Sequence, residues 1–374
     1  MKTLIIYIFK GVLKFIYFFL KMLPTNNKKV VFISRQSDKI NVDFEYIAKL
    51  LKKKDKDIKE VFLCKRFEDS DHNYISYFFT ILSQMYHLAT SKVAVIDSYC
   101  IPVCILNHKK TLKVLQIWHS IGKIKKSGYQ VLDTPAGKSS KFAKNMCMHK
   151  NYDNIVAGGV AFNKFYVEGF NCNESVLLNY GLPRSDKLLN EKDSIRKHVL
   201  EEYPELNNGK INIYYAPTFR KYDIPEAIKM IEQFDLDKVN LIVRFHPKQK
   251  IDTDTLDKRL FTCNDISAVD LLTVSDYLIT DYSSICLDGA VLDVKLLFYV
   301  FDYDKYMSEN GINLDALKIL PTCSSKEIVD LIKIINNDKY DNKAYETFRA
   351  NYLPETLGKS TELITNKILE YMKN

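Results

Sequence analysis

The sequence predicts an α/β protein built from two consecutive doubly wound domains, each a parallel sheet covered by helices on both faces. After about residue 28, short apolar runs alternate with helical stretches, which is the pattern of repeated strand–helix–strand units. The chain has 374 residues, which is long for one hydrophobic core. The alternation also restarts after a Gly-Leu-Pro turn that begins at Gly181. We therefore expect a domain boundary close to this turn.

The first 24 residues are strongly apolar but carry three lysines. Lys10, Lys14 and Lys21 fall within roughly 40° of one another on a helical wheel, and no acidic residue precedes Asp38. A membrane-spanning helix would have about 20 apolar residues without such a stripe, and a signal peptide would have an unbroken apolar centre. The pattern favours a membrane-associating amphipathic helix on an anionic cytoplasmic membrane face, ending at Pro24. A true span and a core helix are the alternatives.

Residues 1–26 are thus expected to form a membrane-associating segment, 27–182 an N-terminal domain on the acceptor side, and 183–374 a C-terminal domain on the donor side. The expected strands are 30–33, 61–63, 93–96, 114–117, 155–157 and 176–178, then 211–216, 239–245, 277–279 and 296–301. The clearest helices are expected at 44–51, 74–88, 162–170 and about 360–372. Ligands of doubly wound domains bind beyond the carboxyl ends of strands, so functional residues should directly follow strands.

Composition narrows the possible functions. The net charge of +8 is modest for this length, so an anionic substrate or lipid surface fits it better than nucleic acid. The eight cysteines contain no Cys-x-x-Cys pair, which favours buried free thiols over a zinc site. No pair of carboxylates has the spacing of a metal site, and no metal or cofactor is expected.

The first candidate site follows the strand expected at 114–117. His119 enters a loop that contains Gly122, Lys123 and Lys126. Histidine is readily poised as a base near neutral pH, and a loop rich in Gly and Lys resembles a phosphate-holding loop without being a Walker A motif. A structural histidine is the alternative reading of this stretch.

Two further candidates follow strands of the second half. Thr218 and Arg220 offer a hydroxyl group and a planar cation that suit phosphate oxygens, although a turn with an exposed arginine would look the same. Arg244, His246 and Lys248 alternate along an extended segment and so share one side, either as a pyrophosphate site or as a solvated edge.

The fourth candidate lies where the apolar run at 277–279 gives way to a helical pattern. Thr280, Ser283 and Ser284 place hydroxyl groups at the expected helix start, and Asp288 lies one turn further on. The positive end of a helix dipole with its backbone N–H groups suits phosphate or pyrophosphate. The alternative is that a serine side chain only caps the N-terminus of this helix.

Taken in order, residues 118–119, 216–220, 244–247, 280–284 and 298–304 resemble the CDP-glycerol glycerophosphotransferase family, the polymerases and primases of teichoic acid and capsule. The resemblance covers about residues 110–370. It implies a GT-B-like architecture and transfer of a polyol phosphate, with glycerol phosphate expected first, from a CDP-polyol donor with release of CMP. It also implies that the acceptor is a lipid-linked glycan or polymer. The enzyme would then be a peripheral protein at the inner face of the bacterial membrane.

The resemblance assigns roles to individual residues. It makes His119 the general base for the acceptor hydroxyl and places His246 on the phosphates of the donor. The donor-binding positions that it implies are Ser283, Ser284 and Asp288, with Thr280 and Arg244 nearby. Ser120 departs from the glycine usual in teichoic-acid polymerases, so the loop after it looks more like capsule members. Without a long N-terminal extra domain, the chain looks like a minimal member.

Two other functions remain open from the sequence. A GT-B glycosyltransferase using a nucleotide-sugar would have a similar cleft but would form a glycosidic bond. A catalytically silent, membrane-bound scaffold in envelope-polymer assembly would not need His119, His246 and Ser284 together.

Overall fold

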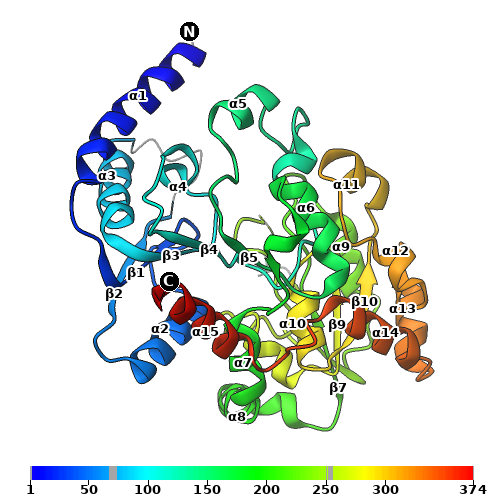
Figure 1. Ribbon diagram of the computed structural model, residues 1–374. Helices are drawn as coiled ribbons and strands as arrows, with labels where there is room; N and C mark the ends of the chain where they lie inside the picture. The colour runs from blue at the N-terminus through cyan, green and yellow to red at the C-terminus, as the bar shows by residue number, and fades with distance from the viewer. Residues whose placement is uncertain (1, 67–73, 250, 252–255, 374) are drawn as a thin grey trace. The chain divides into compact units, whose positions relative to one another are not determined.

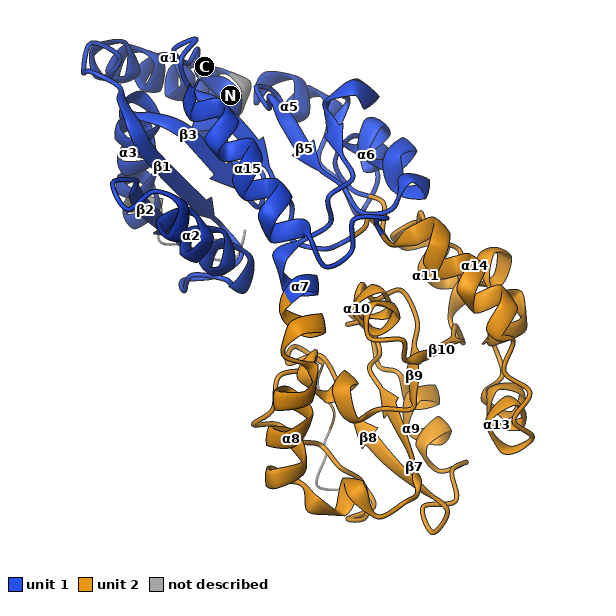
Figure 2. Cartoon of the chain, turned by 60° about the horizontal axis from the view of Figure 1, so that its bottom comes forward, with its two compact units in different colours: residues 1–121, 127–186, 354–374 blue, residues 122–126, 187–353 orange. Residues whose placement is uncertain are grey.

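The computed structural model describes residues 2–66, 74–249, 251 and 256–373, and the chain divides into two compact units (Figures 1 and 2). Unit 1 comprises residues 1–121, 127–186 and 354–374, and unit 2 comprises 122–126 and 187–353. Each unit contains one parallel sheet with helices, which confirms the expected two-sheet α/β architecture.

The sheet of unit 1 has the order β2-β1-β3-β4-β5-β6, and all its pairs are parallel. Its strands are β1 (Asn26–Ser34), β2 (Lys59–Cys64), β3 (Ser91–Ile96), β4 (Lys113–Gln116), β5 (Asn154–Val156) and β6 (Leu177–Leu178). Every position of the central strand β3 is buried, as expected for a parallel strand covered on both faces. The apolar runs thus located all six strands of this sheet.

Helices cover this sheet. They are α1 (Lys2–Leu20), α2 (Val42–Lys54), α3 (Tyr74–Thr90), α4 (Ile101–Ile105), α5 (Ser140–Asn145), α6 (Asn163–Phe170) and α15 (Ser360–Lys373). The side chain of Asn41 caps α2 by accepting from the N–H of Phe44 at 2.9 Å. The last helix, α15, packs on α2 and β3, and its Ile364 and Ile368 are fully buried. The C-terminal segment therefore belongs to unit 1, although residues 183–374 were expected to form one C-terminal domain.

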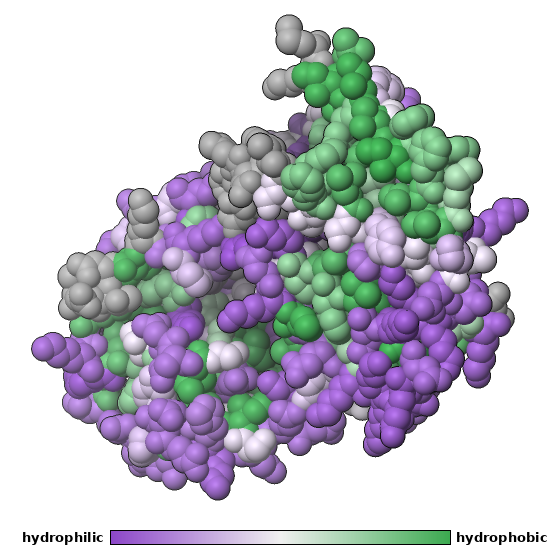
Figure 3. All heavy atoms as spheres, turned by 90° about the vertical axis from the view of Figure 1, so that its left-hand side faces the viewer, coloured by the Kyte–Doolittle hydropathy of each residue, from purple (hydrophilic) through white to green (hydrophobic). Residues whose placement is uncertain are grey.

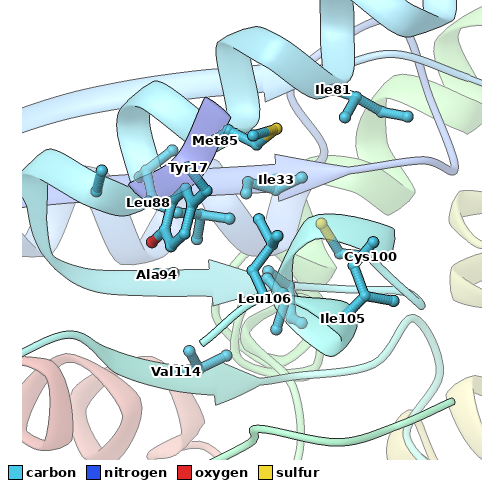
Figure 4. Close-up of a cluster of buried hydrophobic side chains, with 14 of the residues drawn as sticks. Tyr17, Ile33, Ile81, Met85, Leu88, Ala94, Cys100, Ile105, Leu106 and Val114 are labelled. Carbon is cyan, nitrogen blue, oxygen red and sulfur yellow. The ribbon is translucent and has the colours of Figure 1, made fainter. Parts of the chain in front are cut away.

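One apolar face of α1 is part of the fold. Tyr17 is buried in a cluster with side chains of α3, β1 and β3 (Figure 4), and Leu13 belongs to the same cluster. The Tyr17 hydroxyl lies 2.8 Å from Nδ1 of His108. Burying a leucine side chain contributes about 1.5–3 kcal/mol. The buried face of α1 therefore packs as a core helix does, which was one of the alternatives for the first 24 residues.

The opposite side of α1 remains apolar and exposed, and it forms a green surface at the top of Figure 3. The exposed large apolar side chains of this side are Leu4, Ile5, Tyr7, Ile8, Val12, Phe15, Phe18 and Phe19. Contiguous exposed apolar surface of this kind marks an interaction site. No helix in the described part of the chain, α1 included, is long and apolar enough to span a membrane.

The sheet of unit 2 has the order β11-β10-β9-β7-β8, again parallel throughout. Its strands are β7 (Ile211–Tyr215), β8 (Val239–Val243), β9 (Tyr277–Thr280), β10 (Lys295–Tyr299) and β11 (Ser324–Ser325). The two-residue β11 was not predicted because it has no apolar run. The four others were predicted to within two residues at either end.

The helices of the second half are α7 (Pro183–Asn190), which straddles the boundary between the units, α8 (Lys192–Glu202), α9 (Pro225–Ile231), α10 (Ile285–Val291), α11 (Tyr303–Glu309), α12 (Ala316–Ile319), α13 (Ile328–Asn336) and α14 (Asn342–Tyr352). Short 3-10 helices occupy Gly128–Val131, Val160–Phe162, Glu174–Val176, Pro204–Asn207, Asp270–Val274 and Pro321–Cys323. All eight cysteines are free thiols, and five of them are buried.

Candidate active site

His119 is presented by a strained turn after β4. The preceding residue, Trp118, has φ of 60°, a left-handed conformation that bulky residues rarely adopt and that costs about 1–3 kcal/mol. Its N–H donates to the side-chain carbonyl of Gln116 at 2.8 Å, and its ring packs edge-on against Phe170, with the centroids 5.0 Å apart. The same ring lies 4.1 Å from the ring of His119, centroid to centroid. These contacts hold the conformation that orients His119.

The hydrogen bond at Nδ1 defines the tautomer of His119. Nδ1 lies 3.1 Å from the main-chain carbonyl oxygen of Asp97, and a carbonyl can only accept, so Nδ1 carries the proton. In the neutral ring, Nε2 then holds the lone pair. The basic atom of the neutral His119 ring is therefore Nε2.

A cavity of about 320 Å³ opens beside His119 within unit 1. It is lined by Arg35, Gln36, Arg66, Ser98, Tyr99, Trp118 and His119. These residues follow the neighbouring strands β1, β2, β3 and β4, so the cavity lies at the carboxyl edge of the sheet. The cavity therefore lies at the carboxyl ends of strands, where the sequence predicted that functional residues would be found.

Asp97, which follows β3, is almost fully buried. Burial raises the pKa of its carboxyl group to about 6, although hydrogen bonds from Ser34 and Ser98 oppose the rise. The side-chain amide of Asn41 also donates to this carboxyl group at 3.0 Å. The main-chain carbonyl of Asp97 thus binds His119. The side-chain carboxyl group of Asp97 is a separate feature, with a pKa raised to about 6.

The Gly/Lys loop after His119 belongs to unit 2. Its strand-like part pairs with residues 311–314: the N–H of Lys126 donates to the carbonyl of Gly311 at 3.3 Å, and the N–H of Asn313 donates to the carbonyl of Ile124 at 2.8 Å. Gly122 and Lys123 are buried, whereas Lys126 is exposed. Of the three loop residues singled out in the sequence, only Lys126 presents its side chain to solvent.

Arg220 is buried in unit 2 and is not the exposed cation that the sequence suggested. Its guanidinium group forms an ion pair with Asp281 at 2.8 Å and two bonds with Asp302, at 2.8 and 3.0 Å. Burial alone would lower the pKa of Arg220, but the two carboxylates outweigh burial and raise it. Burial likewise opposes ionisation of Asp302, yet Arg220 keeps the pKa of that carboxyl group below its usual value. This arginine fastens three strand ends together.

Thr218 and Thr280 are part of the same framework. The N–H of Thr218 donates to the carboxylate of Asp281 at 2.9 Å, and the Thr280 hydroxyl donates to the carbonyl of Ala216 at 2.7 Å. Both threonines are buried. They join the ends of β7 and β9 and support the loop that leads to α10.

His246, which follows β8, has the opposite tautomer to His119. Its Nδ1 lies 3.1 Å from the main-chain N–H of Lys248, and an N–H can only donate, so Nδ1 accepts. The proton of the neutral ring therefore sits on Nε2, which makes His246 a hydrogen-bond donor through that atom. Its ring also packs 5.3 Å from the ring of Phe219.

Gln249 connects the His246 loop to the loop after β7. Its side-chain oxygen accepts from the N–H of Arg220 at 2.8 Å, and its own N–H donates to the carbonyl of His246, also at 2.8 Å. His246 is thereby positioned by the same framework that holds Arg220.

The side chain of Arg244 binds main-chain groups of the segment beside β8. Its guanidinium group donates to the main-chain carbonyls of Cys263 at 2.6 Å and Asn264 at 3.2 Å. It fastens the segment beside β8. The side chains of Arg244 and His246 therefore have different hydrogen-bond partners.

The turn into α10 holds the remaining predicted residues. Ser283 and Ser284 are half-buried, and Ser284 is the residue at the N-cap position. The Ser283 hydroxyl oxygen accepts from the N–H of Ile285 at 3.4 Å. Asp288 is buried within the helix. The two serine side chains are the more accessible members of this group.

Within unit 2, the structure thus brings Thr218, Arg220 and Thr280 into one buried framework and links His246 to it. Residues 15–370 match the family described as CDP-glycerol:poly(glycerophosphate) glycerophosphotransferase. The chain belongs to this family. The resemblance drawn from the sequence motifs is therefore confirmed, and the chain is a CDP-polyol phosphotransferase.

Among similar proteins, the teichoic acid ribitol-phosphate primase of Bacillus spizizenii is 30% identical over all of this chain and 99% of its own length. The teichoic acid glycerol-phosphate primase of Bacillus subtilis is 26% identical over 77% of this chain and 76% of its own. A variant of the wall teichoic acid polymerase TagF soaked with CDPG superposes with a TM-score of 0.69. That match has 20% identity and covers 93% of this chain and 90% of the other, which shows a common fold.

Several residues that contact the candidate site were not predicted from the sequence. Asp302 lies in the 298–304 block that formed part of the resemblance but received no role. Asp97 and Arg35 both follow predicted strands, so the strand-end rule could have found them. Gln249 had no sequence signal. Within the described residues of the transferase, no three His, Cys, Asp or Glu side chains converge as metal ligands would.

Proposed function

We propose that the chain transfers a polyol phosphate from a CDP-activated donor to a hydroxyl group of a lipid-linked cell-envelope glycan or polymer, with release of CMP. The observation that carries the proposal is the opposite tautomer of the two histidines. His119 offers a lone pair at Nε2, as a base requires, and His246 offers an N–H there, as a phosphate ligand requires.

In the proposed step, Nε2 of His119 takes the proton of the acceptor hydroxyl, whose oxygen attacks the β-phosphorus of the CDP-polyol. A new P–O bond forms to the acceptor, and the bond from the β-phosphorus to the bridging oxygen breaks. The electron pair and negative charge leave with CMP. A positioned general base contributes about 10²–10⁴-fold to such a step.

Unit 2 would hold the donor. His246 donates to its phosphate oxygens, while Ser283 and Ser284 contribute hydroxyl groups at the start of α10, and Asp288 lies behind them. Arg220, with Thr218 and Thr280, acts as a positioning residue because its guanidinium group is occupied by two carboxylates. Arg244 positions the segment at 262–264 in the same way.

Glycerol phosphate is the first candidate for the transferred group, because the motif resemblance and the family description both name it. Ribitol phosphate is the second candidate, since the full-length relative at 30% identity is a ribitol-phosphate primase. The CDPG-soaked TagF variant supports a CDP-activated donor in either case.

We further propose that the exposed apolar side of α1 docks on the cytoplasmic face of the bacterial membrane. The helix combines this side with Lys14, which is exposed, and Lys21, which is half-buried. Aromatic and aliphatic side chains enter the interface between headgroups and acyl chains, and lysines are attracted to anionic headgroups. The enzyme would then meet a lipid-linked acceptor at the surface where that acceptor resides.

The test is CMP release by the purified protein with membranes as the acceptor source, across CDP-glycerol, CDP-ribitol and a set of sugar nucleotides. Release of CMP from one CDP-polyol, lost in the His119→Ala variant, would support both the reaction and the base. Turnover of a sugar nucleotide alone would instead support a glycosyltransferase. Binding of a CDP-polyol without turnover on any acceptor would contradict the proposed transfer.

A further inference from the structure

We infer that Gln116 is a positioning residue of this transferase, and that its side-chain amide sets the tautomer of His119. The inference rests on the proposed function, because it concerns the residue that is proposed as the base. It deepens that function by naming the group that orients the base. Neither the sequence motifs nor the family resemblance gave Gln116 a role.

Gln116 is a polar residue in an apolar part of the fold. It is the last residue of β4 and is fully buried, and its neighbours Leu115 and Ile117 are buried as well. A buried amide group loses its hydrogen bonds to water, and this loss is costly unless protein groups replace them. An apolar side chain of similar size would avoid the cost. The bonds that the amide group forms should therefore show what it does.

Both ends of this amide group are bonded to the main chain. Its Oε1 accepts from the N–H of Trp118 at 2.8 Å, and its Nε2 donates to the carbonyl of Ser98 at 3.2 Å. The reversed amide would place two donors together at Trp118 and two acceptors together at Ser98. The two partners thus fix the orientation of the side chain.

These partners are the immediate neighbours of the two groups that form the His119 bond. Trp118 precedes His119, and Ser98 follows Asp97, whose carbonyl oxygen lies 3.1 Å from Nδ1 of His119. One amide group therefore holds both sides of that bond. It fixes the turn that carries the ring and, across the β3–β4 pair, the segment that carries the acceptor atom.

The turn requires such a restraint because its backbone is strained. Trp118 has φ of 60°, whereas a bulky residue is more stable at negative φ. A change of φ at this position would redirect the chain at His119 and separate Nδ1 from the carbonyl of Asp97. The neutral ring could then carry its proton on Nε2, and this tautomer has no lone pair there to accept the proton of a hydroxyl group.

The variant that tests the inference is Gln116→Met. Methionine has the same length as glutamine but no N–H group, and its sulfur is only a weak acceptor. The matched control is Gln84→Met. Gln84 is also a buried glutamine of unit 1, 1% exposed, but it lies on α3 and accepts from the thiol of Cys100.

Nitrogen NMR of protein labelled at its seven histidines would measure the tautomer directly, at a pH above the titration of the ring. The signals of His119 are the ones that His119→Ala lacks. We expect the proton on Nδ1 in the wild type and in Gln84→Met, and a loss of this preference in Gln116→Met. An unchanged tautomer in Gln116→Met would overturn the inference.

Turnover provides the second readout, as CMP release with membranes as the acceptor source. We expect Gln116→Met to lower kcat by about 100-fold, the effect of displacing a reacting group by about 1 Å. Direct binding of the CDP-polyol should stay at the wild-type level, because the proposed donor site is in unit 2. Gln84→Met should keep the kcat of the wild type, and a wild-type kcat in Gln116→Met would contradict the role of Gln116.

The wild-type protein gives a test that does not depend on the folding of a variant. The main-chain N–H of Trp118 is bonded to a buried oxygen, so it should exchange slowly with deuterium oxide. Exchange as fast as that of an open loop would mean that Gln116 does not hold the turn.

Failure of this inference can be told from failure of the proposed function. Near-normal CMP release by His119→Ala would contradict the proposed base, and the role of Gln116 would fall with it. If His119→Ala is inactive while Gln116→Met keeps both its turnover and its tautomer, only the role of Gln116 is wrong.

Discussion

Nδ1 of His119 lies 3.1 Å from the main-chain carbonyl oxygen of Asp97, and this bond joins the ends of β3 and β4. The bond uses the main chain of Asp97, so a substitution of its side chain leaves the acceptor atom in place. The base and the buried carboxyl group beside it can therefore be tested separately.

Replacing the imidazole of His119 should remove the proposed base and leave the fold intact. We expect His119→Ala to lower kcat by about 10²–10⁴-fold, with unchanged binding of the CDP-polyol in a direct titration. The control is His198→Ala, because His198 is exposed on α8. Near-normal turnover in His119→Ala would remove His119 from the mechanism.

The buried carboxyl group of Asp97 should make stability depend on pH. Its pKa rises from 3.8 in the unfolded chain to about 6 in the folded protein, chiefly through burial. The unfolded state thus loses its proton first, so this residue lowers stability as pH rises from about 4 to 6. A rise of about two pKa units corresponds to about 3 kcal/mol at most.

Asp97→Asn, which cannot ionise, should remove this contribution. Urea denaturation at pH 4 and pH 7 would measure it: the variant should be more stable relative to wild type at pH 7 than at pH 4, with a larger free energy of unfolding. An equal difference between variant and wild type at both pH values would show that Asp97 does not retain its proton in the folded state.

The ion pairs of Arg220 should stabilise unit 2 strongly. Arg220→Ala leaves Asp281 and Asp302 buried without their cation, and breaking a buried pair in this way costs about 3–5 kcal/mol. Urea denaturation would measure the loss. Arg220→Lys should restore only part of it, because an ammonium group cannot repeat the paired bonds to Asp302.

Arg259 provides the comparison, since it forms an ion pair with Asp257 on the exposed surface. Arg259→Ala should change the unfolding midpoint little, because exposed pairs are solvated and screened. If Arg220→Ala and Arg259→Ala lowered the free energy of unfolding equally, the buried ion pairs would contribute no more to stability than an exposed pair does.

The exposed side of α1 should bind vesicles of anionic lipid. Phe15 and Phe19 are 67% and 52% exposed, so replacing both with serine leaves the core unchanged. Each buried phenylalanine contributes about 1.5–3 kcal/mol, and we expect at least about tenfold weaker binding in cosedimentation. Val329→Ser, on the exposed face of α13, is the control.

Point substitutions suit this test better than removal of the helix. Leu13 and Tyr17 are buried beneath it, and Leu13→Ala alone should cost about 2–5 kcal/mol of stability. A truncated protein could leave the membrane fraction because it unfolds. Unchanged vesicle binding by the Phe15→Ser/Phe19→Ser protein would contradict membrane docking through α1.

The sequence predicted the sheets well because apolar periodicity is local. Val30 to Ile33 and Val93 to Ile96 are continuous apolar runs of the kind that only buried strands and helices contain, and their length favours strands. β11 consists of Ser324 and Ser325 alone, and its pairing with β10 depends on neighbours that no local pattern records.

The site was predicted in part. His119 and His246 directly follow apolar runs, so the strand-end rule located them, but their tautomers depend on main-chain atoms of Asp97 and Lys248. Arg220 resembled a phosphate ligand because its main partner, Asp302, lies 82 residues further along the chain. The burial of that pair is a tertiary property.

The packing of α15 on α2 and β3 has a consequence for folding during synthesis. During synthesis, the ribosome completes all of unit 2 before it releases the segment that starts at Pro354. Until then, the surface that Ile364 and Ile368 will cover stays open to water and to other nascent chains. Unit 1 is thus completed only after unit 2, and a pause in translation before residue 354 would leave unit 1 vulnerable to aggregation or in need of a chaperone.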